Sequence, residues 1–362
     1  MVTASHNPGE YNGFKVVLNG KSRSAEDVKA IRARILRKQV YEGAGQEHRH
    51  DIVSNYIATI FSDVALAGDI SIVIDAGNGV TGTVAPKLFE ELGCHVTPLF
   101  CDLDGTFPNH SPDPSKEENL SALIEKVKDV GADLGVAFDG DGDRIAVVTP
   151  EGKIIWPDQL LMLFAKDIVS RNPGADVVFD VKSTRHLNAC ITSHGGRPIM
   201  WKTGHAPMKQ KMLETGALVG GEYSGHIFIK DRWYGFDDGM YAAARLIEIL
   251  SLQGESLDMI FSEFETSPCT PEIRVPVVEE KKFTIIERLQ NEAEFGDGKV
   301  TKIDGLRVDF PYGWGLVRAS NTSADLTLRF EADDDDALHR VKSLFVQEIR
   351  KIDNSLTIEW NQ

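Results

Sequence analysis

The sequence predicts an α/β protein of several domains that ends in a smaller α+β domain. The first observation is length, because 362 residues exceed what one ordinary domain contains. The second is a recurring order of apolar strand, glycine or polar turn, amphipathic helix and second strand, which is typical of α/β units. The third is a change of this pattern after about residue 266, where short strands and two helices follow.

The clearest α/β unit covers residues 70–100. Its strands are expected at residues 71–75 and 95–100, and its helix at residues 84–92, ended by Gly93. A similar unit covers residues 177–200, with a helix near residues 187–193. The similarity of the two units indicates a weak internal repeat of α/β domains.

Residues 266–362 predict an antiparallel sheet with two helices. Strands are expected at residues 273–278, 307–310 and 326–330, and helices at residues 283–292 and 337–351. The acidic run from Asp333 to Asp336 could form an interaction patch, but it directly precedes the second helix. Carboxylates at a helix start accept bonds from free backbone N–H groups and favour the helix dipole, so we expect a helix cap.

Composition restricts the classes of function. Hydrophobic residues make up 42% and charged residues 26%, which is typical of a folded globular protein. The net charge of −16 argues against nucleic acid, and no apolar run approaches the ~20 residues of a membrane span. The four cysteines form no C-x-x-C pair and the first residues lack a signal-peptide pattern, so we expect a cytoplasmic protein with free thiols. An anionic substrate would require local clusters of Lys and Arg.

The first string with chemical content is Thr3–Pro8 (TASHNP), which contains Ser5. Asn-Pro predicts a turn, and a serine in a turn often only bonds to nearby backbone. The adjacent Ser5 and His6 do not form a hydrolase motif, because no G-x-S-x-G surrounds them.

The second string, Asp139–Arg144 (DGDGDR), follows the alternating apolar residues of a strand. Three carboxylates at a spacing of two can turn onto one hard cation, and three such ligands suit Mg²⁺. The string is not an EF-hand, since Arg144 and Pro150 stand where Gly and Glu are needed. The alternative is a solvated acidic turn.

Two further strings suggest recognition of a phosphosugar. Gly221–His226 (GEYSGH) places a carboxylate and a hydroxyl two residues apart, on one side of an extended chain, where both can bind sugar hydroxyls. Arg318–Ser323 (RASNTS) combines one guanidinium with hydroxyl and amide donors, which suits a phosphate. Taken alone, these strings are also consistent with a β-turn and a polar loop.

In this order, the four strings resemble those of the α-D-phosphohexomutases, and most closely the bacterial phosphomannomutase/phosphoglucomutase kind. The segment Glu10–Lys15 (EYNGFK) extends the first match, and similarity continues to about residue 355. The resemblance implies three similar mixed α/β domains, the first only a remnant here, and a C-terminal α+β domain around a central cleft. The domains are expected at residues 1–50, 51–152, 153–265 and 266–362.

The resemblance also implies roles for the matching residues. Ser5 would carry the phosphoryl group, assisted by the catalytic residues His6, Lys15 and Arg144. One Mg²⁺ ion would be held by Ser5, Asp139, Asp141 and Asp143. The substrate would be bound by Lys182, His205, Glu222, Ser224, His226, Arg318, Ser320, Asn321 and Thr322. Without the resemblance, Lys182 would be read as a solvated lysine after a strand, and His205 as a helix cap.

The implied reaction interconverts hexose 1-phosphate and hexose 6-phosphate. The phosphoserine donates to the free hydroxyl, a hexose 1,6-bisphosphate forms and reorients, and the other phosphate returns to Ser5. We therefore expect Mg²⁺ and hexose 1,6-bisphosphate as cofactors, a small phosphosugar as partner, neither nucleic acid nor membrane, and a monomer. Mannose and glucose are both candidate sugars.

Other functions compete with this reading. Gly77–Gly82 (GNGVTG) follows a strand, and Asp102 or Asp104 follows the next one, as in an NAD-dependent oxidoreductase. That function explains none of the other four strings, and the glycines more simply form a tight turn. Within the family, phosphoglucosamine mutase is the alternative, although such relatives commonly have Gln where this chain has Tyr223.

The position of Ser5 near the start suggests a chain shortened at its N-terminal end. Residues 1–50 supply one expected strand, at residues 14–18, and one helix, at residues 25–38, which cannot close an α/β layer. The apolar helix face of Val28, Ile31 and Ile35 would then lack a sheet. A non-catalytic fragment of the mutase is therefore a further expectation.

Overall fold

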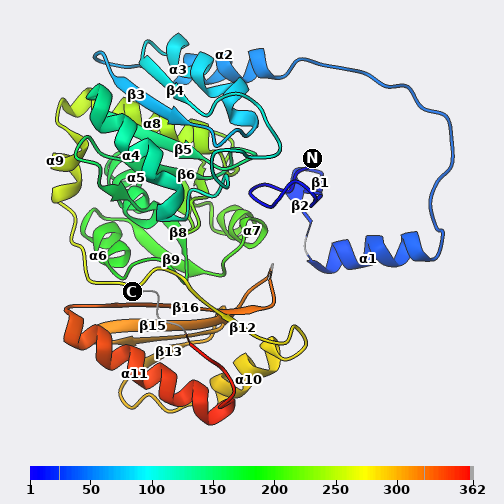
Figure 1. The fold of residues 1–362 in the computed structure, drawn as a ribbon, viewed down its shortest axis with the longest axis vertical. Helices are drawn as coiled ribbons and strands as arrows, with labels where there is room; N and C mark the ends of the chain where they lie inside the picture. The colour runs from blue at the N-terminus through cyan, green and yellow to red at the C-terminus, as the bar shows by residue number, and fades with distance from the viewer. Residues whose placement is uncertain (24, 322, 359–362) are drawn as a thin grey trace. The chain divides into compact units, whose positions relative to one another are not determined.

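The computed structural model describes residues 1–23, 25–321 and 323–358 (Figure 1). Backbone contacts divide the chain into two compact units. Unit 1 comprises Met1–Val178, Cys190–Ile199 and Gly204–Phe264, and unit 2 comprises Phe179–Ala189, Met200–Thr203 and Glu265–Gln362. Over the described part of the chain, no helix is both long and apolar enough to cross a membrane.

A five-stranded mixed sheet organises the first α/β layer of unit 1. Across the sheet the strands are β4 (His95–Leu99), β3 (Ser71–Asp75), β5 (Leu134–Phe138), β6 (Ile145–Val148) and β7 (Ile154–Ile155). β3 is parallel to β4 and β5, whereas β6 and β7 continue the sheet in antiparallel pairing. The strand expected at residues 71–75 is confirmed, and the one expected at residues 95–100 is confirmed to within one residue.

The helices of this layer place its apolar residues against the sheet. They are α2 (Val53–Asp63), α3 (Ala85–Glu91) and α4 (Ser121–Val130), with the 3₁₀ helices η1 (Val80–Thr83) and η2 (Glu117–Leu120). Leu123 and Val127, one turn apart on α4, share a buried cluster with Val73 of β3. The predicted helix at residues 84–92 corresponds to α3, and Gly93 follows it at a φ of 95°, which suits glycine.

A second, four-stranded sheet has the order β11 (Ile227–Ile229), β10 (Val219–Gly221), β8 (Asp176–Asp180) and β9 (Arg197–Trp201). Its region contains α5 (Pro157–Arg171), α6 (His186–Ser193), α7 (His205–Thr215), α8 (Gly239–Gln253) and α9 (Leu257–Ser262). The observed α6 confirms the expected helix near residues 187–193. The two α/β layers support the predicted repeat of one plan.

The N-terminal segment forms a short hairpin rather than the longer strand expected at residues 14–18. β1 (Val17–Leu18) pairs antiparallel with β2 (Lys21–Ser22) across Asn19 and Gly20, whose φ angles of 52° and 71° are those of a tight hairpin turn. This turn leaves two residues on each side for pairing. Phe14 instead makes one isolated bridge with Val2.

Helix α1 (Ala25–Leu36) follows the hairpin and matches the expected helix. As expected from the sequence, its apolar side chains are exposed: Val28, Ile31 and Ile35 retain 48%, 39% and 59% of their accessible surface. Residues 39–52 contain no helix or strand and are exposed throughout.

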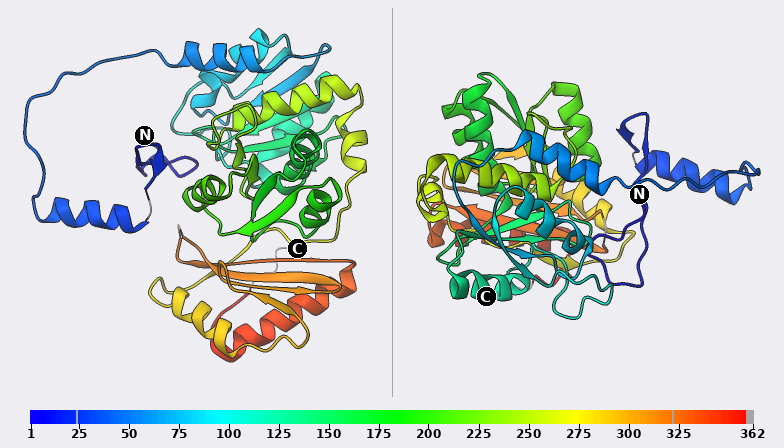
Figure 2. Two further views of the ribbon diagram at one scale, coloured as in Figure 1. Left: turned by 180° about the vertical axis from the view of Figure 1, so that it is seen from behind. Right: turned by 90° about the horizontal axis from the view of Figure 1, so that it is seen from above.

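Unit 2 contains an antiparallel sheet with helices on one face (Figure 2). The strand order is β12 (Ile273–Pro276), β16 (Asp325–Ala332), β15 (Gly313–Ala319), β14 (Leu306–Phe310) and β13 (Lys299–Thr301), and the helices are α10 (Lys282–Glu292) and α11 (Asp335–Ile352). The Asp334 carboxylate accepts a 2.7 Å bond from the Ala337 N–H, so the predicted cap of the last helix is confirmed.

Sequence patterns missed β13 and β15. β15 contains Gly313 and Gly315, which weaken a strand pattern. The structure explains why glycine is needed: a side chain at Gly315 would collide with the ring of Phe345 from α11. The glycine therefore permits close packing of helix on sheet, an effect that no local pattern reports.

Candidate active site

Ser5 lies in a tight turn with strained backbone. Its φ is 52°, a left-handed conformation that costs a non-glycine residue about 1–3 kcal/mol and persists where surrounding contacts impose it. The Thr3 hydroxyl accepts the Ser5 N–H at 2.9 Å, and the Asn7 N–H donates to the Ala4 carbonyl at 3.0 Å. The turn directs the hydroxyl to the metal loop: Ser5 Oγ donates to Asp139 Oδ2 at 2.5 Å.

Glycines allow other loops to approach this turn. A side chain at Gly140 would collide with the Ser5 carbonyl, and one at Gly79 would lie 2.8 Å from the Gly140 oxygen. The Val80 N–H also donates to that oxygen at 3.1 Å. The glycine-rich string Gly77–Gly82, which resembles a dinucleotide motif, is therefore a tight turn that supports the Asp139–Arg144 loop.

A long loop after β4 contacts the Ser5 turn and is held by a buried ion pair. A side chain at Gly9 would lie 2.9 Å from the Gly105 oxygen, so the two loops touch. His110 Nε2 lies 3.1 Å from Asp75 Oδ2, and Asp75 is fully buried at the end of β3. The bond to Asp75 outweighs burial and raises the pKa of His110.

We expect this pair to make stability depend on pH. Because the folded pKa of His110 exceeds the unfolded value, the pair stabilises the fold fully below about pH 6.5 and loses this contribution as pH rises through the folded pKa. Replacement of His110 by Gln should lower the free energy of unfolding by about 1 kcal/mol near pH 6 and by less near pH 9. Denaturant titrations at both pH values check this, with the exposed His339→Gln as control. A difference that does not vary with pH would contradict it.

The three aspartates predicted to bind metal lie together. Asp139 is fully buried, and its Oδ1 accepts the Gly142 N–H at 2.9 Å and the Arg144 N–H at 3.2 Å. Asp141 Oδ2 accepts bonds from the Thr3 hydroxyl at 2.9 Å and from Lys15 Nζ at 2.8 Å. Burial, followed by repulsion from Asp143, raises the pKa of Asp139.

This cluster fits a hard cation. One carboxylate oxygen from each of Asp139, Asp141 and Asp143 lies within 4.8 Å of the others. Asp141 Oδ1 is buried and has no hydrogen-bond partner among the described residues. The Lys15 ammonium bridges Asp141 and Asp143 and stands in for a cation at this position. Mg²⁺ prefers oxygen ligands such as these carboxylates, and an oxygen with no hydrogen bond from the described residues is available to bind it.

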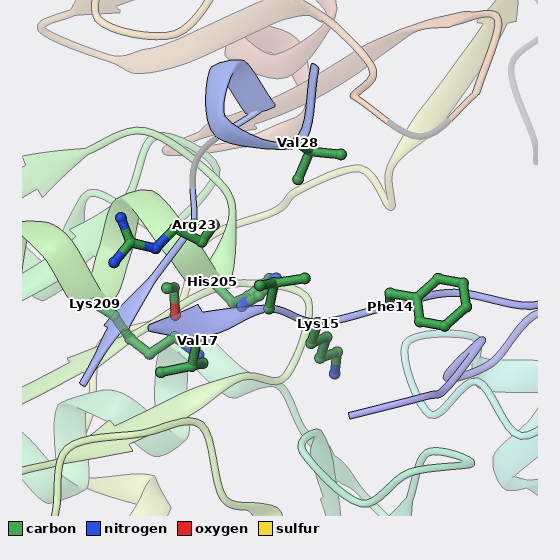
Figure 3. A pocket seen from close by; sticks show the side chains of 9 residues that line it. Phe14, Lys15, Val17, Arg23, Val28, His205 and Lys209 are labelled. Carbon is green, nitrogen blue, oxygen red and sulfur yellow. The ribbon is translucent and has the colours of Figure 1, made fainter. Parts of the chain in front are cut away.

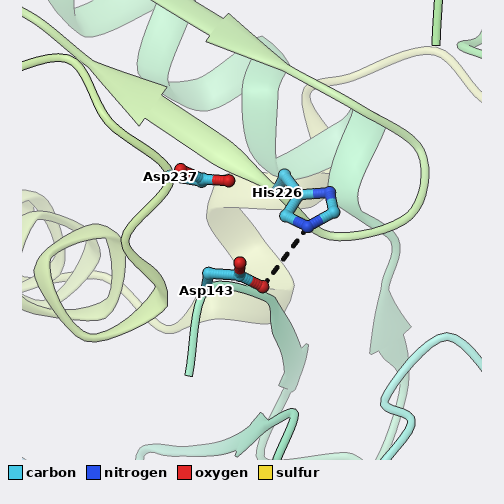
Figure 4. Close-up of side chains that lie close together, drawn as sticks. All are labelled: Asp143, His226 and Asp237. Carbon is cyan, nitrogen blue, oxygen red and sulfur yellow. Dashed lines mark ion pairs between the residues drawn. The ribbon is translucent and has the colours of Figure 1, made fainter. Parts of the chain in front are cut away.

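The predicted sugar-binding loop is a turn and not the extended chain that the sequence analysis assumed. The Gly225 N–H donates to the Glu222 carbonyl at 3.0 Å, and Gly225 has a φ of 105°. His226 connects this turn to the metal loop, since its Nδ1 lies 2.9 Å from Glu222 Oε2. Its Nε2 lies 3.3 Å from Asp143 Oδ1, the ion pair drawn in Figure 4. Ser224 Oγ also lies 3.1 Å from His226 Nδ1.

His226 is therefore a buried cation in this arrangement. Burial and the neighbouring Arg144 lower its pKa, but the bonds to Asp143 and Glu222 are stronger and raise the pKa to about 9. Glu222, in turn, accepts the Gly204 N–H at the start of α7. The metal loop, the sugar loop and α7 thus form one connected polar network.

A pocket of about 200 Å³ beside Lys15 is rich in basic groups (Figure 3). Its basic members are Lys15, Arg23, His205 and Lys209, and Phe14, Val17 and Val28 are among its apolar members. This is the kind of local cationic cluster that an acidic protein needs in order to bind a phosphate ester. Burial, followed by the nearby Lys209, lowers the pKa of His205.

Unit 2 contains the remaining predicted residues. Lys182 is buried and its ammonium pairs with Glu272. Arg318 lies at the end of β15, where its Nε donates to Asp304 at 3.0 Å, and its Nη2 has no hydrogen-bond partner among the described residues. Ser320 Oγ lies 2.9 Å from Ser323 Oγ, Asn321 is exposed, and Thr322 lies outside the described residues.

Sequence reasoning missed several groups at these sites. Thr3 bonds both Ser5 and Asp141, and its place two residues before Ser5 was the available signal. The buried Asp113 lies 4.0 Å from Arg144. Asp237 accepts a 2.8 Å bond from Lys209 and lies 3.7 Å from His205 Nδ1. No local string marks the last two, because their partners are distant in sequence.

Comparisons with known proteins agree with this geometry. Four family models match successive parts of the chain: the phosphoglucomutase/phosphomannomutase α/β/α domains I (residues 1–42), II (residues 53–152) and III (residues 156–267), and the C-terminal domain (residues 272–348). A phosphomannomutase/phosphoglucomutase of Pseudomonas aeruginosa is 56% identical over 358 residues, which cover 99% of this chain and 77% of that protein. The chain belongs to the phosphoglucomutase/phosphomannomutase family.

Other members support the assignment. A phosphoglucomutase of Neisseria meningitidis is 50% identical over 350 residues, covering 95% of this chain and 76% of that protein. The crystal structure of a phosphoglucomutase/phosphomannomutase family protein from Burkholderia thailandensis superposes with a TM-score of 0.93 at 45% identity, covering 99% of this chain and 77% of that one. The predicted family and the predicted class of mixed α/β domains with a C-terminal α+β domain are thus confirmed.

Proposed function

We propose that this chain is a phosphomannomutase/phosphoglucomutase that interconverts hexose 1-phosphate and hexose 6-phosphate through a phosphoserine at Ser5. The observation that carries the proposal is the 2.5 Å bond from Ser5 Oγ to Asp139 within a cluster of three carboxylates. A hydroxyl held on strained backbone beside a cluster of carboxylates suits reversible phosphorylation.

Phosphoryl transfer requires neutralised charge and a movable proton. In the first half-reaction, the bond between Ser5 Oγ and phosphorus breaks as phosphorus bonds to the free sugar hydroxyl; that hydroxyl loses its proton and the Ser5 oxygen gains one. In the second, the bond between phosphorus and the other sugar oxygen breaks as phosphorus bonds to Ser5 Oγ; the Ser5 hydroxyl loses its proton and the sugar oxygen gains one. Lys15 stays protonated, because Asp143 and Asp141 outweigh burial and raise its pKa. A raised pKa makes Lys15 a weaker acid but keeps its charge, so we propose that this ammonium stabilises the departing Ser5 oxygen by a hydrogen bond. His6 Nδ1, 3.1 Å from Ser5 Oγ, is close enough to accept one.

Mg²⁺ would be held by Asp139, Asp141 and Asp143 together with Ser5. When bound, this cation would neutralise charge on the phosphoryl oxygens. Arg144, 3.9 Å from Asp139, adds positive charge beside this cluster. The first transfer, from phosphorylated Ser5 to the hexose monophosphate, produces a hexose 1,6-bisphosphate, which we propose as the intermediate that reorients.

The remaining predicted residues would hold the sugar and the phosphate that does not react. Glu222 and Ser224 offer acceptors for sugar hydroxyls, with His226 between them and the metal loop. Lys182, His205, Ser320, Asn321 and Thr322 stay proposed substrate contacts. Among the described residues, the four cysteines form no disulfide, which agrees with the expected cytoplasmic location, and a monomer is part of the proposal.

A coupled assay with glucose 1-phosphate, mannose 1-phosphate and glucosamine 1-phosphate tests the function. We expect turnover of glucose or mannose 1-phosphate and slower turnover of glucosamine 1-phosphate. Faster turnover of glucosamine 1-phosphate would favour the phosphoglucosamine mutase alternative. No turnover of any of the three by a folded protein would favour the non-catalytic fragment.

Arg318→Ala should raise KM more than it lowers kcat. Asp304 orients Arg318, whose Nη2 has no hydrogen-bond partner in the described part of the chain. The phosphate that Arg318 would bind stays in place during each transfer, so Arg318 would contribute about equally to binding the substrate and the transition state. A lost charged bond of about 1.5–3 kcal/mol corresponds to roughly a tenfold or greater rise in KM. Steady-state kinetics check this against the exposed Arg288→Ala. An unchanged KM would count against the phosphate role.

A further inference from the structure

The unit 2 sheet has two chemically different faces. Side chains alternate between the faces along each strand. Val308, Val317 and Phe330 point into the apolar core, while α10 and α11 lie on that face of the sheet (Figure 2). The alternate residues Arg307 and Arg329 lie on the opposite face, in one row with Leu316 between them. Both arginines are nevertheless buried, with exposures of 1% and 2%.

These two guanidinium groups hold three successive backbone carbonyls. Arg307 Nη1 donates to the Val181 carbonyl at 2.7 Å and to the Ser183 carbonyl at 3.0 Å. Arg329 Nη1 donates to the carbonyl of Lys182. The segment 181–183, which belongs to unit 2, is thereby fixed at every residue to the row of side chains on the sheet.

Trp314 orients the row. The Arg307 guanidinium stacks 3.9 Å from the centre of its ring, and the Arg329 guanidinium lies 5.6 Å away. Trp314 is fully buried and shares an apolar cluster with Val181 and Leu316. The stacked geometry restricts each guanidinium to one plane, so that its N–H groups reach the carbonyls in a defined direction.

Stability alone does not explain these arginines. Buried cations carry a large desolvation penalty, and apolar residues of similar volume often stabilise a fold as well or better. Arg307 is paired with Asp309 at 3.0 Å, which offsets this penalty in part. What the arginines add beyond packing is a fixed position for the backbone of Lys182.

We infer that Arg307 and Arg329 are positioning residues that fix the Lys182 ammonium relative to Arg318. The inference rests on the proposed function, in which both cations contact the phosphosugar. Arg318 follows Trp314 and Leu316 at every second position of β15, so it lies on the same face of the sheet as the two arginines. The same face of the unit 2 sheet therefore determines the positions of both cations that we propose bind the substrate.

A double-mutant cycle tests the inference. KM for hexose 1-phosphate is measured for the wild type, Arg307→Met, Lys182→Met and the double variant, all in the full chain. Met keeps an apolar stem of similar length and removes the bonds to the carbonyls. We expect Arg307→Met to raise KM about fivefold to tenfold with a smaller change in kcat, and to have little further effect in the Lys182→Met background.

Two outcomes would overturn the inference in distinguishable ways. If Arg307→Met raises KM equally in both backgrounds, Arg307 does not act through Lys182, while the proposed function stands. If Lys182→Met leaves KM unchanged, the proposed substrate role of Lys182 fails and the inference fails with it.

Two further variants guard against a trivial result. Arg329→Lys keeps the buried charge, so we expect it to preserve the fold even if Arg307→Met does not. It should also raise KM, because the lysine ammonium lacks the planar set of N–H donors of the arginine guanidinium. Arg340→Met removes an exposed arginine that lies 5.0 Å from the Tyr312 ring in the same unit, and it should change nothing. An unchanged KM in Arg329→Lys, with wild-type stability, would also contradict the inference.

Discussion

Replacement of Ser5 by alanine is expected to lower mutase turnover by about 10⁴-fold or more. The variant removes the hydroxyl oxygen that we propose carries the phosphoryl group beside Asp139, and loss of a covalent nucleophile has effects of this order in other enzymes. Stability should change little, because Ser5 is partly exposed and alanine retains the turn. A coupled assay of hexose 1-phosphate conversion measures the loss, and Ser355→Ala, at an exposed serine, is the matched control.

Mass spectrometry provides an independent measurement of the same step. The Ser5 peptide of the wild type should carry one phosphoryl group, and excess hexose phosphate should remove it into the bisphosphate. The Ser5→Ala protein should carry none. Full activity of this variant, or a phosphoryl group on another residue that turns over with substrate, would contradict the assignment of Ser5.

Asp141→Asn is expected to weaken Mg²⁺ binding at least about tenfold and to lower kcat strongly. The change removes one hard ligand and one charge from the cluster, and the amide is a poorer ligand for Mg²⁺ than the carboxylate. Asp141 Oδ1, which has no hydrogen-bond partner within residues 1–23, 25–321 and 323–358, is the oxygen available to a metal, because Oδ2 already accepts bonds from Thr3 and Lys15. The fold should tolerate the change, since the shape of the side chain is kept.

Calorimetric titration with Mg²⁺ measures this effect without reference to catalysis. The control is Asp129→Asn, at an exposed position near the end of α4, which should leave Mg²⁺ binding and turnover unchanged. Equal Mg²⁺ affinity and equal turnover in Asp141→Asn and the wild type would mean that the three aspartates only form a turn. Reduced activity with unchanged affinity would instead assign Asp141 to the orientation of Lys15.

Much of the fold could be predicted because its signals are local. The strand at residues 71–75 and the acidic cap of α11 each depend on neighbours in sequence, and both are confirmed. β15 was missed for the opposite reason: its glycines suit packing against Phe345, a residue of another element. The strand predicted at residues 14–18 was too long, because the tight turn at Asn19 and Gly20 limits pairing.

The candidate site divides in the same way. The three aspartates were predicted from one short string, because a metal loop needs closely spaced ligands. The role of Ser5 was predicted from the resemblance to the phosphohexomutases, and it stays a proposal. No string around Asp113 or Asp237 marked these residues. Their place in the site is evident only from the cations beside them, Arg144 and Lys209, which are distant in sequence.

The sequence by itself determined the family and the class of chemistry, because its motifs are short runs of residues that stand in the order of the family. The roles of the individual residues stay proposals. Only the tertiary structure decided how these motifs combine. It brings Thr3 and Lys15 onto Asp141, links His226 to both Asp143 and Glu222, and fixes the backbone of Lys182 with buried guanidinium groups. Such contacts join residues up to about 150 positions apart. They depend on the folded chain, because a buried charged group is costly unless it is paired and hydrogen-bonded.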